Sequence, residues 1–315
     1  MNRALTLATK TAGTPAATPF LKWAGGKGQL LPQLLGRLPS SLSDGRITKY
    51  VEPFLGGGAV YFALQGRPGF SKSLLADVNR DLVLTYGAIR DDVRKVISSL
   101  AKLSDQYLSS ADVQRESFFY EVRDEFNAER GTIDSAAMRS DGHKRAAQLI
   151  FLNRTCYNGL YRVNSKGQFN VPYGRYRNPV ICHTANLMAV SDALANTAIV
   201  ESDFEQIAHH IDNRTFVYFD PPYRPLNATS SFTSYASGSF DDNDQRRLAG
   251  FYRSMSARGA KLMLSNSDPM NNGEQDRFFD ELYSGFTITR VQATRMINSK
   301  SSGRGKISEI LVTNF

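Results

Sequence analysis

Four consecutive residues, Asp220-Pro221-Pro222-Tyr223, combine a carboxylate, a rigid turn and an aromatic ring. They directly follow the apolar run Thr215 to Phe219, which predicts a strand whose carboxyl end carries Asp220. Open α/β sheets keep their ligand sites at that end of their strands. The Asp220 carboxylate and the Pro221 carbonyl can both accept hydrogen bonds from one NH2 group. Such acceptors would localise the lone pair of an adenine amine, otherwise delocalised into the ring, and favour its attack on a methyl carbon.

The other residues of this tetrapeptide fit the same chemistry. Pro221 and Pro222 each fix φ and stiffen the turn, and Tyr223 offers a flat face on which an extruded base can stack. The alternative interpretation is an ordinary tight turn that ends a strand, because Asp and Pro are common turn residues.

A glycine-rich turn lies earlier in the chain. The run Ile47 to Glu52 predicts a strand, which breaks at Pro53 into Phe54-Leu55-Gly56-Gly57-Gly58, and Ala59 to Gln65 can begin a helix. A second short strand, Ser73 to Ala76, ends at Asp77. This carboxylate follows the glycines by about twenty residues, the spacing that places it beside a ribose in nucleotide-binding sheets.

Two other nucleotide-binding motifs do not fit. The residues from Gly56 onward read Gly-Gly-Gly-Ala-Val-Tyr, not the GxGxxG of dinucleotide-binding oxidoreductases. A P-loop needs Ser or Thr after its lysine, and Gly28 follows Lys27 here. Trp23 and Lys27 nevertheless lie in a glycine-rich segment, which favours side chains that face a ligand, although a lone Trp is also a common core residue.

The stretch from His143 to Ser191 contains no Asp or Glu. It interleaves basic residues with aromatic rings and amides, which are the groups that phosphate contact, base-edge reading and stacking require. A solvated helix face would normally mix charges of both signs. The alternative is a basic surface above a small aromatic core.

The remaining pattern predicts the elements that position these residues. Further strands are expected at Ala198 to Glu201 and Lys261 to Ser265, with a helix at Asp244 to Ala257, so the fold class is α/β with a doubly wound, mostly parallel Rossmann-like sheet. Two β-rich runs, Phe286 to Gln292 and Glu309 to Phe315, predict a C-terminal antiparallel hairpin. The loop that joins them is basic and contains Arg295, Lys300, Arg304 and Lys306.

Amphipathic stretches such as Ser117 to Glu129 and His143 to Leu152 indicate an inserted helical unit. We therefore expect a disordered tail at 1–18, a catalytic domain made of 19–81 and 183–315, and a target-recognition domain at 82–182 that carries a β-hairpin. No internal repeat of solenoid or propeller period is present.

Composition narrows the class of partner. The chain has 38 Lys and Arg against 30 Asp and Glu, a net charge of +8, and a pI near 9.4, which favours a polyanion. Its two cysteines, Cys156 and Cys182, lack the spacing of a disulfide framework or metal site, so no metal is expected. No apolar run is long enough for a membrane span. We expect a monomer that acts in the cytoplasm, on a bacterial nucleoid or as a phage product in its host.

Taken together, these motifs resemble those of the Dam-type DNA adenine-N6 methyltransferases (D12 class, alpha group), from about Phe20 to the C-terminus. In this class the cofactor motif precedes the target-recognition domain and the catalytic motif follows it. The matching segments occur in the family's order: FLKWAGGK (20–27), VEPFLGGG (51–58), LLADVNRDL (74–82), LNRTCYNGLYRVNSKGQFNVPYGRY (152–176) and DPPY (220–223).

The resemblance implies S-adenosyl-L-methionine as cofactor and double-stranded DNA as substrate, with no obligatory protein partner. Residues expected to line the cofactor are Trp23, Lys27, Phe54, Gly56, Gly58, Asp77, Phe204 and Asp220, with Asp77 on the ribose. Glu201-Ser202-Asp203-Phe204 matches the family only loosely.

The resemblance also implies the palindrome GATC as target. Arg162 and Lys22 would each read a guanine, Tyr157 would insert into the base stack, and Asn158 would hold the space left by the flipped adenine. The full set of residues expected to contact DNA is Lys22, Asn153, Arg154, Tyr157, Asn158, Leu160, Arg162, Asn164, Pro172 and Arg175.

Departures from the family are few. Cys156 stands where glycine is usual, which could alter how the hairpin meets DNA, and 131–142 resembles an extra loop.

Other activities fit less well. Cytosine-N4 methylation is associated with Ser-Pro-Pro-Tyr, and protein glutamine methylation with Asn-Pro-Pro-Tyr. Cytosine-C5 methylation needs Pro-Cys, and neither cysteine follows a proline. A DNA-binding regulator without turnover would be expected to have lost Asp220 or the glycine turn, and both are intact.

Overall fold

The computed structural model describes residues 16–65, 70–129, 137–224, 240–272, 275–294 and 306–315. The N-terminal tail expected at 1–18 falls almost wholly outside these ranges, and so does the basic loop between the last two strands. No helix in the described ranges is long and apolar enough to cross a membrane.

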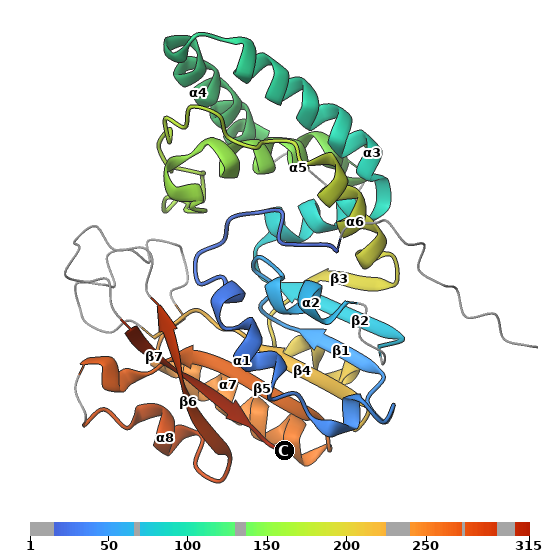
Figure 1. Ribbon diagram of the computed structural model, residues 1–315, viewed down its shortest axis with the longest axis vertical. Helices are drawn as coiled ribbons and strands as arrows, with labels where there is room; N and C mark the ends of the chain where they lie inside the picture. Colours follow the sequence, from blue (N-terminus) through green and yellow to red (C-terminus); the bar gives the residue numbers. More distant parts are fainter. Residues whose placement is uncertain (1–15, 66–69, 130–136, 225–239, 273–274, 295–305) are drawn as a thin grey trace, which may run out of the picture.

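A seven-stranded sheet forms the centre of the molecule, in the order β3-β2-β1-β4-β5-β7-β6 (Figure 1). Strands β1 to β5 run parallel, whereas β7 pairs antiparallel with both β5 and β6. The strands are β1 (Lys49–Glu52), β2 (Lys72–Asp77), β3 (Thr197–Glu201), β4 (Thr215–Phe219), β5 (Lys261–Ser267), β6 (Thr287–Thr294) and β7 (Lys306–Thr313). The predicted fold class is confirmed, including the C-terminal antiparallel hairpin.

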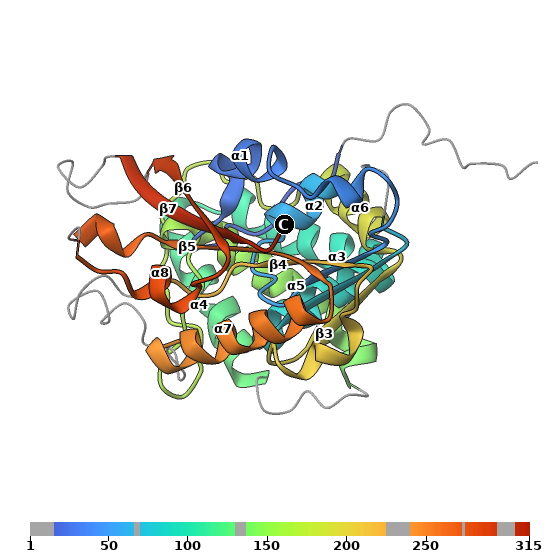
Figure 2. The same cartoon turned by 90° about the horizontal axis from the view of Figure 1, so that it is seen from below.

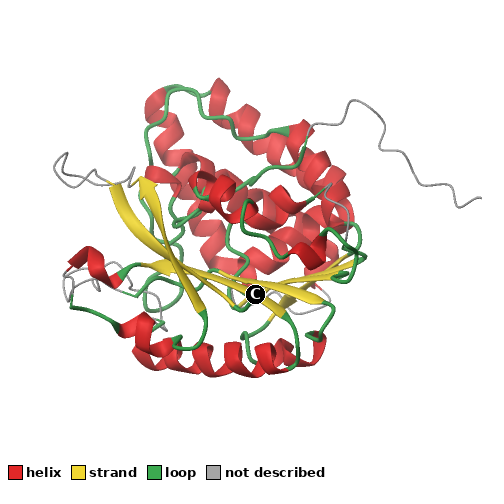
Figure 3. Ribbon diagram, turned by 60° about the horizontal axis from the view of Figure 1, so that its bottom comes forward, coloured by secondary structure: helices red, strands yellow, loops and turns green. Residues whose placement is uncertain are grey.

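Alternate residues of the central strands enter two separate cores. Phe216 and Tyr218 of β4 face one core, while Val217 and Phe219 face the other. All five residues of β4 are buried, which is why the strand reads as a continuous apolar run and not as an alternating one. Figure 3 shows the sheet between two layers of helices.

Helices cover both faces of the sheet (Figure 2). One face packs against α7 (Asp242–Ala257) and α8 (Phe278–Leu282). The other packs against α1 (Leu31–Leu35), α2 (Ala59–Leu64), α6 (Thr184–Leu194) and the start of α3 (Arg80–Ser109). The Asp241 side chain caps α7 by accepting from the amides of Asn243 and Asp244.

Helix α3 joins the sheet to the inserted helical unit. It starts beside β2 and continues to α4 (Asp112–Ala128) and α5 (Ala137–Thr155), with a kink at Asp92, whose φ and ψ are −153° and 64°. The expected domain border between 81 and 82 lies in its first turn. The core on this side runs without a break from Phe216 in the sheet to Phe119 and Phe151 in the helices.

In the inserted unit, the structure differs from the sequence-based expectation at an expected loop and at the expected hairpin. The stretch 131–142, expected as an extra loop, contributes 137–142 to the first turns of α5, and the remainder lies outside the described residues. The expected recognition hairpin has two isolated antiparallel bridges, Cys156 with Tyr173 and Val163 with Phe169, in place of regular strands. Its shape depends on side-chain contacts described below.

Candidate active site and nucleic-acid interface

The glycine turn after β1 is shaped by contacts that exclude a side chain. Gly56 and Gly58 have φ of 46° and 66°, the left-handed region that glycine enters without strain. A Cβ on Gly58 would lie 2.8 Å from the Tyr86 hydroxyl oxygen, and one on Gly56 would lie 3.0 Å from Cδ1 of Trp23. The backbone can therefore approach a ligand closely here, beneath the Trp23 ring.

Asp77 ends β2 and faces this turn. Its Oδ2 accepts from the Gly56 amide at 3.1 Å, and its Oδ1 accepts from the Asn79 amide at 2.9 Å. Burial raises the pKa of the Asp77 carboxyl, and the two amide hydrogen bonds oppose that shift. The carboxylate is thus fixed at the end of its strand, where ribose hydroxyls can donate to it.

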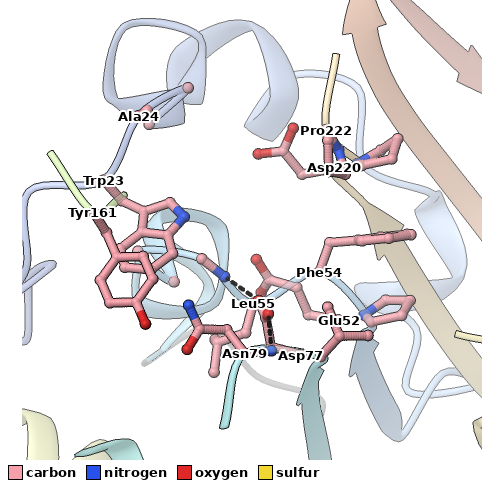
Figure 4. A pocket seen from close by; sticks show the side chains of 18 of the residues that line it. Trp23, Ala24, Glu52, Phe54, Leu55, Asp77, Asn79, Tyr161, Asp220 and Pro222 are labelled. Carbon is pink, nitrogen blue, oxygen red and sulfur yellow. Dashed lines mark hydrogen bonds between the residues drawn. The ribbon is translucent and has the colours of Figure 1, made fainter. Parts of the chain in front are cut away.

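A cavity of 960 Å³ connects the glycine turn to the end of β4 (Figure 4). Ligand pockets commonly measure roughly 300–1,000 Å³, so this one is large enough to hold more than a small metabolite. Figure 4 shows Trp23 and Tyr161 on one side of the cavity and Asp220 on another, with Asp77 and Asn79 at its base. Phe204 lines the same cavity, and its ring lies 5.7 Å from that of Phe54.

Asp220 leaves β4 beside a buried lysine. Lys27 Nζ lies 2.6 Å from Asp220 Oδ1 and donates to the Gly25 carbonyl at 2.8 Å. Ser265 Oγ, on β5, donates to the same carboxylate at 3.3 Å. Burial raises the pKa of Asp220, and Lys27 and Ser265 both act to lower it. In this state the ammonium of Lys27 occupies one acceptor of the carboxylate, and the side chain of Lys27 is only 3% exposed.

Tyr223 is held in place from two sides. Its hydroxyl donates to Glu309 Oε2 at 2.6 Å, and Lys27 Nζ lies 4.7 Å from the centre of its ring. Glu309 stands on β7, and burial raises the pKa of its carboxyl. The antiparallel hairpin thereby contributes to the corner of the site that contains the DPPY sequence.

A second buried carboxylate, Glu52, ends β1 and also lines the cavity. The pKa of its carboxyl is raised to about 8, chiefly by burial; the hydrogen bond from Tyr50 at 2.7 Å acts to lower the pKa, and the charge of Asp220 acts to raise it. The sequence reasoning missed Glu52, Ser265 and Glu309. A charged residue inside an apolar strand, as in Ser-Glu-Ile-Leu-Val at 308–312, was the available signal.

In the predicted recognition segment, several side chains face solvent. Tyr157 is 55% exposed, and it adjoins Asn158, whose φ of 56° places it in the left-handed region. The other exposed members of the predicted DNA-contacting set are Lys22, Arg162, Pro172 and Arg175. Arg162 donates through Nε to Asn170 Oδ1 at 2.8 Å and also lines the cavity that contains Asp220.

Other members of that set face the protein. Asn153 is 1% exposed: its Oδ1 accepts from the Lys22 amide, and its Nδ2 donates to the carbonyls of Lys22 and Gly159. Asn164 closes a turn by accepting from the amides of Lys166 and Gln168. These contacts shape the backbone that presents the exposed residues.

Arg154 and Leu160 are half-buried. The Arg154 guanidinium donates twice to the Phe20 carbonyl, and together with Lys22 it lines a second cavity, of 340 Å³. Leu160 packs against the apolar core. Cys156 is fully buried, and burial raises the pKa of its thiol to about 12, so this residue acts on the segment from below and not at its surface.

Comparison with known proteins assigns the class. Residues 23–297 match the family model of the D12 class N6 adenine-specific DNA methyltransferases, and the chain belongs to this family. It is an adenine-specific DNA methyltransferase, an enzyme that takes DNA as substrate and uses a methyl donor of the S-adenosylmethionine type. No group of three or more His, Cys, Asp or Glu in the described part of the chain could hold a metal ion.

Particular relatives cover almost the whole chain. The chain is 51% identical over 298 residues to Type II methyltransferase M.MjaIII of Methanocaldococcus jannaschii, covering 94% of this chain and 99% of that protein. It is 39% identical over 300 residues to Type II methyltransferase M1.LlaDCHI of Lactococcus lactis subsp. cremoris, covering 94% and 95%. It is 32% identical over 292 residues to the DNA adenine methylase of Escherichia coli, covering 93% of both.

Proposed function

We propose that this enzyme methylates the adenine of GATC in duplex DNA after that adenine has left the helix. The observation that carries the proposal is that Arg162, an exposed arginine of the recognition segment, lines the same cavity as the half-buried Asp220. A base that is contacted by Arg162 would therefore lie close to the base that reaches Asp220. Because the Asp220 side chain is only 22% exposed, a base stacked in a duplex cannot approach it.

The chemistry rests on the corner around Asp220. The cofactor supplies an electrophilic methyl group, and transfer forms an N–C bond at the amine while the C–S bond to sulfur breaks. The Asp220 carboxylate and the Pro221 carbonyl accept hydrogen bonds from the amine, Pro222 keeps the turn rigid, and Tyr223 stacks on the base. The amine must displace or share the Lys27 ammonium at Asp220 Oδ1. The proton that nitrogen gives up can pass to this carboxylate.

The residues around the glycine turn fit S-adenosyl-L-methionine. Asp77 is a fixed carboxylate for ribose hydroxyls, and Gly56 and Gly58 leave the backbone bare where a Cβ would meet Trp23 or Tyr86. Phe204 lies against Phe54 at the edge of the cavity, where an adenine ring of the cofactor can pack. Trp23 and Lys27 line the same cavity, and we assign them to the cofactor-binding residues as well.

Recognition is assigned to the exposed residues of the segment. Arginine can pair bidentately with guanine O6 and N7, and lysine supplies one flexible donor to the same edge, so Arg162 and Lys22 each read a guanine. Tyr157 enters the base stack and Asn158 lies in the space left by the adenine. Leu160 contacts bases through its apolar side chain, Pro172 and Arg175 seat the segment, and Arg154 contacts DNA. Asn153 and Asn164 shape the loop from within.

In this proposal 19–81 with 183–315 form the catalytic domain and 82–182 the recognition domain, and a monomer acts on DNA in the cytoplasm.

Plasmid DNA from a host that lacks adenine methylation but expresses the enzyme tests the proposed methylation of GATC. A nuclease that cuts GATC only when its adenine is methylated should cut this DNA, and one that requires unmethylated GATC should not. Plasmid from cells that express Asp220→Ala should show the reverse pattern. Wild-type plasmid that resists the first nuclease and is cut by the second would overturn the GATC assignment.

A further inference from the structure

Asp81, four residues after Asp77 and in the first turn of α3, is a carboxylate that the chemistry above does not use. It lines the main cavity, yet both of its oxygens are engaged by the inserted helical unit. Arg145 Nε, on α5, donates to Oδ1 at 2.7 Å, and the Tyr161 hydroxyl donates to Oδ2 at 3.2 Å. The Asp81 and Arg145 side chains are 13% and 3% exposed.

Arg145 cannot follow Asp81 if that carboxylate turns away. Its NH1 group donates to the Phe126 carbonyl at 2.8 Å, and its guanidinium lies 3.9 Å from the centre of the Phe126 ring. Breaking a buried ion pair leaves an uncompensated charge, which is strongly unfavourable. The Asp81 carboxylate is therefore a fixed point of attachment for Tyr161.

Tyr161 connects this fixed point to both binding functions. Its ring stacks on Trp23, with the ring centres 5.4 Å apart and the planes at 22°, and Trp23 in turn covers Gly56 of the glycine turn (Figure 4). Along the chain, Tyr161 immediately precedes Arg162. One side chain thus contacts the wall of the cofactor pocket and sets the position of the residue assigned to a guanine.

We infer that Asp81 and Tyr161 are positioning residues that couple the cofactor pocket to the guanine-reading segment. A ligand that orders Trp23 also orders Tyr161 and, through its backbone, Arg162. Because coupling between two binding sites is reciprocal, cofactor should tighten cognate DNA binding by the same factor as cognate DNA tightens cofactor binding. This inference rests on the assignment of Arg162 to a guanine of the target.

The test measures binding, without turnover. Fluorescence anisotropy gives the affinity for a GATC duplex and for a scrambled duplex, each with and without saturating S-adenosylhomocysteine. Tyr161→Phe keeps the stack on Trp23 and loses the bond to Asp81, whereas Tyr161→Leu loses both. Tyr120→Phe, on α4, is the matched control. These variants avoid Asp81→Ala, which would strand the Arg145 charge and can unfold the protein.

In the wild type and in Tyr120→Phe, we expect S-adenosylhomocysteine to tighten binding to the GATC duplex by at least about fivefold, the lower end of typical coupling between sites. The factor should shrink in Tyr161→Phe and fall to about one in Tyr161→Leu, while binding to the scrambled duplex stays the same in all proteins. A wild-type factor that survives in Tyr161→Leu, or a wild type with no such factor, would overturn the inference. A wild type that binds both duplexes alike would instead overturn the proposed target sequence.

Discussion

The corner around Asp220 and the recognition segment at 153–177 hold their functional side chains in opposite ways. At the corner, the functional groups themselves are half-buried and paired with buried partners, as in the 2.6 Å contacts of Asp220 with Lys27 and of Tyr223 with Glu309. In the segment, buried residues such as Asn153 hold only backbone, and Tyr157 and Arg162 project outward.

This difference indicates that substitutions can change the target sequence more easily than the chemistry. A substitution at the corner can leave a buried charge such as that of Lys27 without its charged partner, so few alternatives are tolerated. A substitution of an exposed reader leaves its supporting backbone intact, so target sequence can change without loss of chemistry.

Asp220→Ala should abolish methyl transfer without weakening DNA binding. Loss of a hydrogen-bonding group aimed at the developing charge costs about 3 kcal/mol or more of transition-state stabilisation, so kcat should fall by at least about 100-fold. Duplex affinity should remain near the wild-type value. Single-turnover kinetics with circular dichroism as the check on folding measure this. Asp220→Asn, which keeps a side-chain oxygen near Lys27, is the companion variant, and appreciable turnover by a folded Asp220→Ala protein would contradict the mechanism.

Asp77→Ala should act on cofactor and spare DNA. A hydrogen bond to a charged group contributes about 1.5–3 kcal/mol, so affinity for S-adenosylhomocysteine should drop by roughly 10–100-fold. Titration calorimetry gives that value, and anisotropy gives the affinity for DNA without cofactor. If cofactor affinity were unchanged, the ribose contact would have to lie elsewhere.

Arg162→Ala and Asn153→Ala separate reading from support. Losing a bidentate contact should cost roughly 1–3 kcal/mol at the cognate site and relax discrimination at one base pair. Asn153→Ala removes partners from Lys22 and Gly159 and should weaken binding to the cognate site while also lowering the melting temperature. Binding to a panel of duplexes with single substitutions distinguishes the two. Equal weakening by Arg162→Ala at every duplex would make this residue a phosphate contact.

Glu52 gives the site a pH dependence. Its pKa of about 8 in the folded protein lies above the ordinary value of 4.5, so its contribution to stability is fully present below about pH 4.5 and is lost as the pH rises through 8. Glu52→Gln cannot ionise. We expect its free energy of unfolding, relative to the wild type, to increase by about 1 kcal/mol or more between pH 5 and pH 9. Urea unfolding at pH 5 and pH 9 measures the difference. If the free energy of unfolding changed equally in both proteins, the raised pKa of Glu52 would be refuted.

The sequence was most informative where a motif joined a strand. Asp220 and Asp77 follow apolar runs, and the structure places both at the carboxyl ends of β4 and β2. The sequence predicts the strand Thr215–Phe219 to the residue because all of its side chains are buried and most of them are apolar or aromatic. Helix α3 was not delimited, because it crosses from one unit to the next and kinks at Asp92 within a continuous pattern.

Side-chain partners could not be predicted. The contact of Lys27 with Asp220, and that of Tyr223 with Glu309, join residues far apart in the chain. The first depends on where the short helix at Lys27–Gln29 packs, and the second on how strands β4, β5 and β7 align. Composition also could not tell Asn153 from Asn158. Both are amides in a basic, aromatic stretch, but one is buried by the Lys22 backbone and the other lies exposed in the left-handed region.

Single-molecule sequencing tests most directly whether the half-buried Asp220 carboxylate and the exposed recognition segment together direct methylation to one adenine. DNA would come from a host without adenine methylation that expresses the wild type, Asp220→Ala or Arg162→Ala. We expect N6-methyladenine on both strands of GATC for the wild type, none for Asp220→Ala, and additional sites that differ from GATC at one base pair for Arg162→Ala. Methylation by the wild type in a different motif, or an unchanged motif in Arg162→Ala, would contradict it.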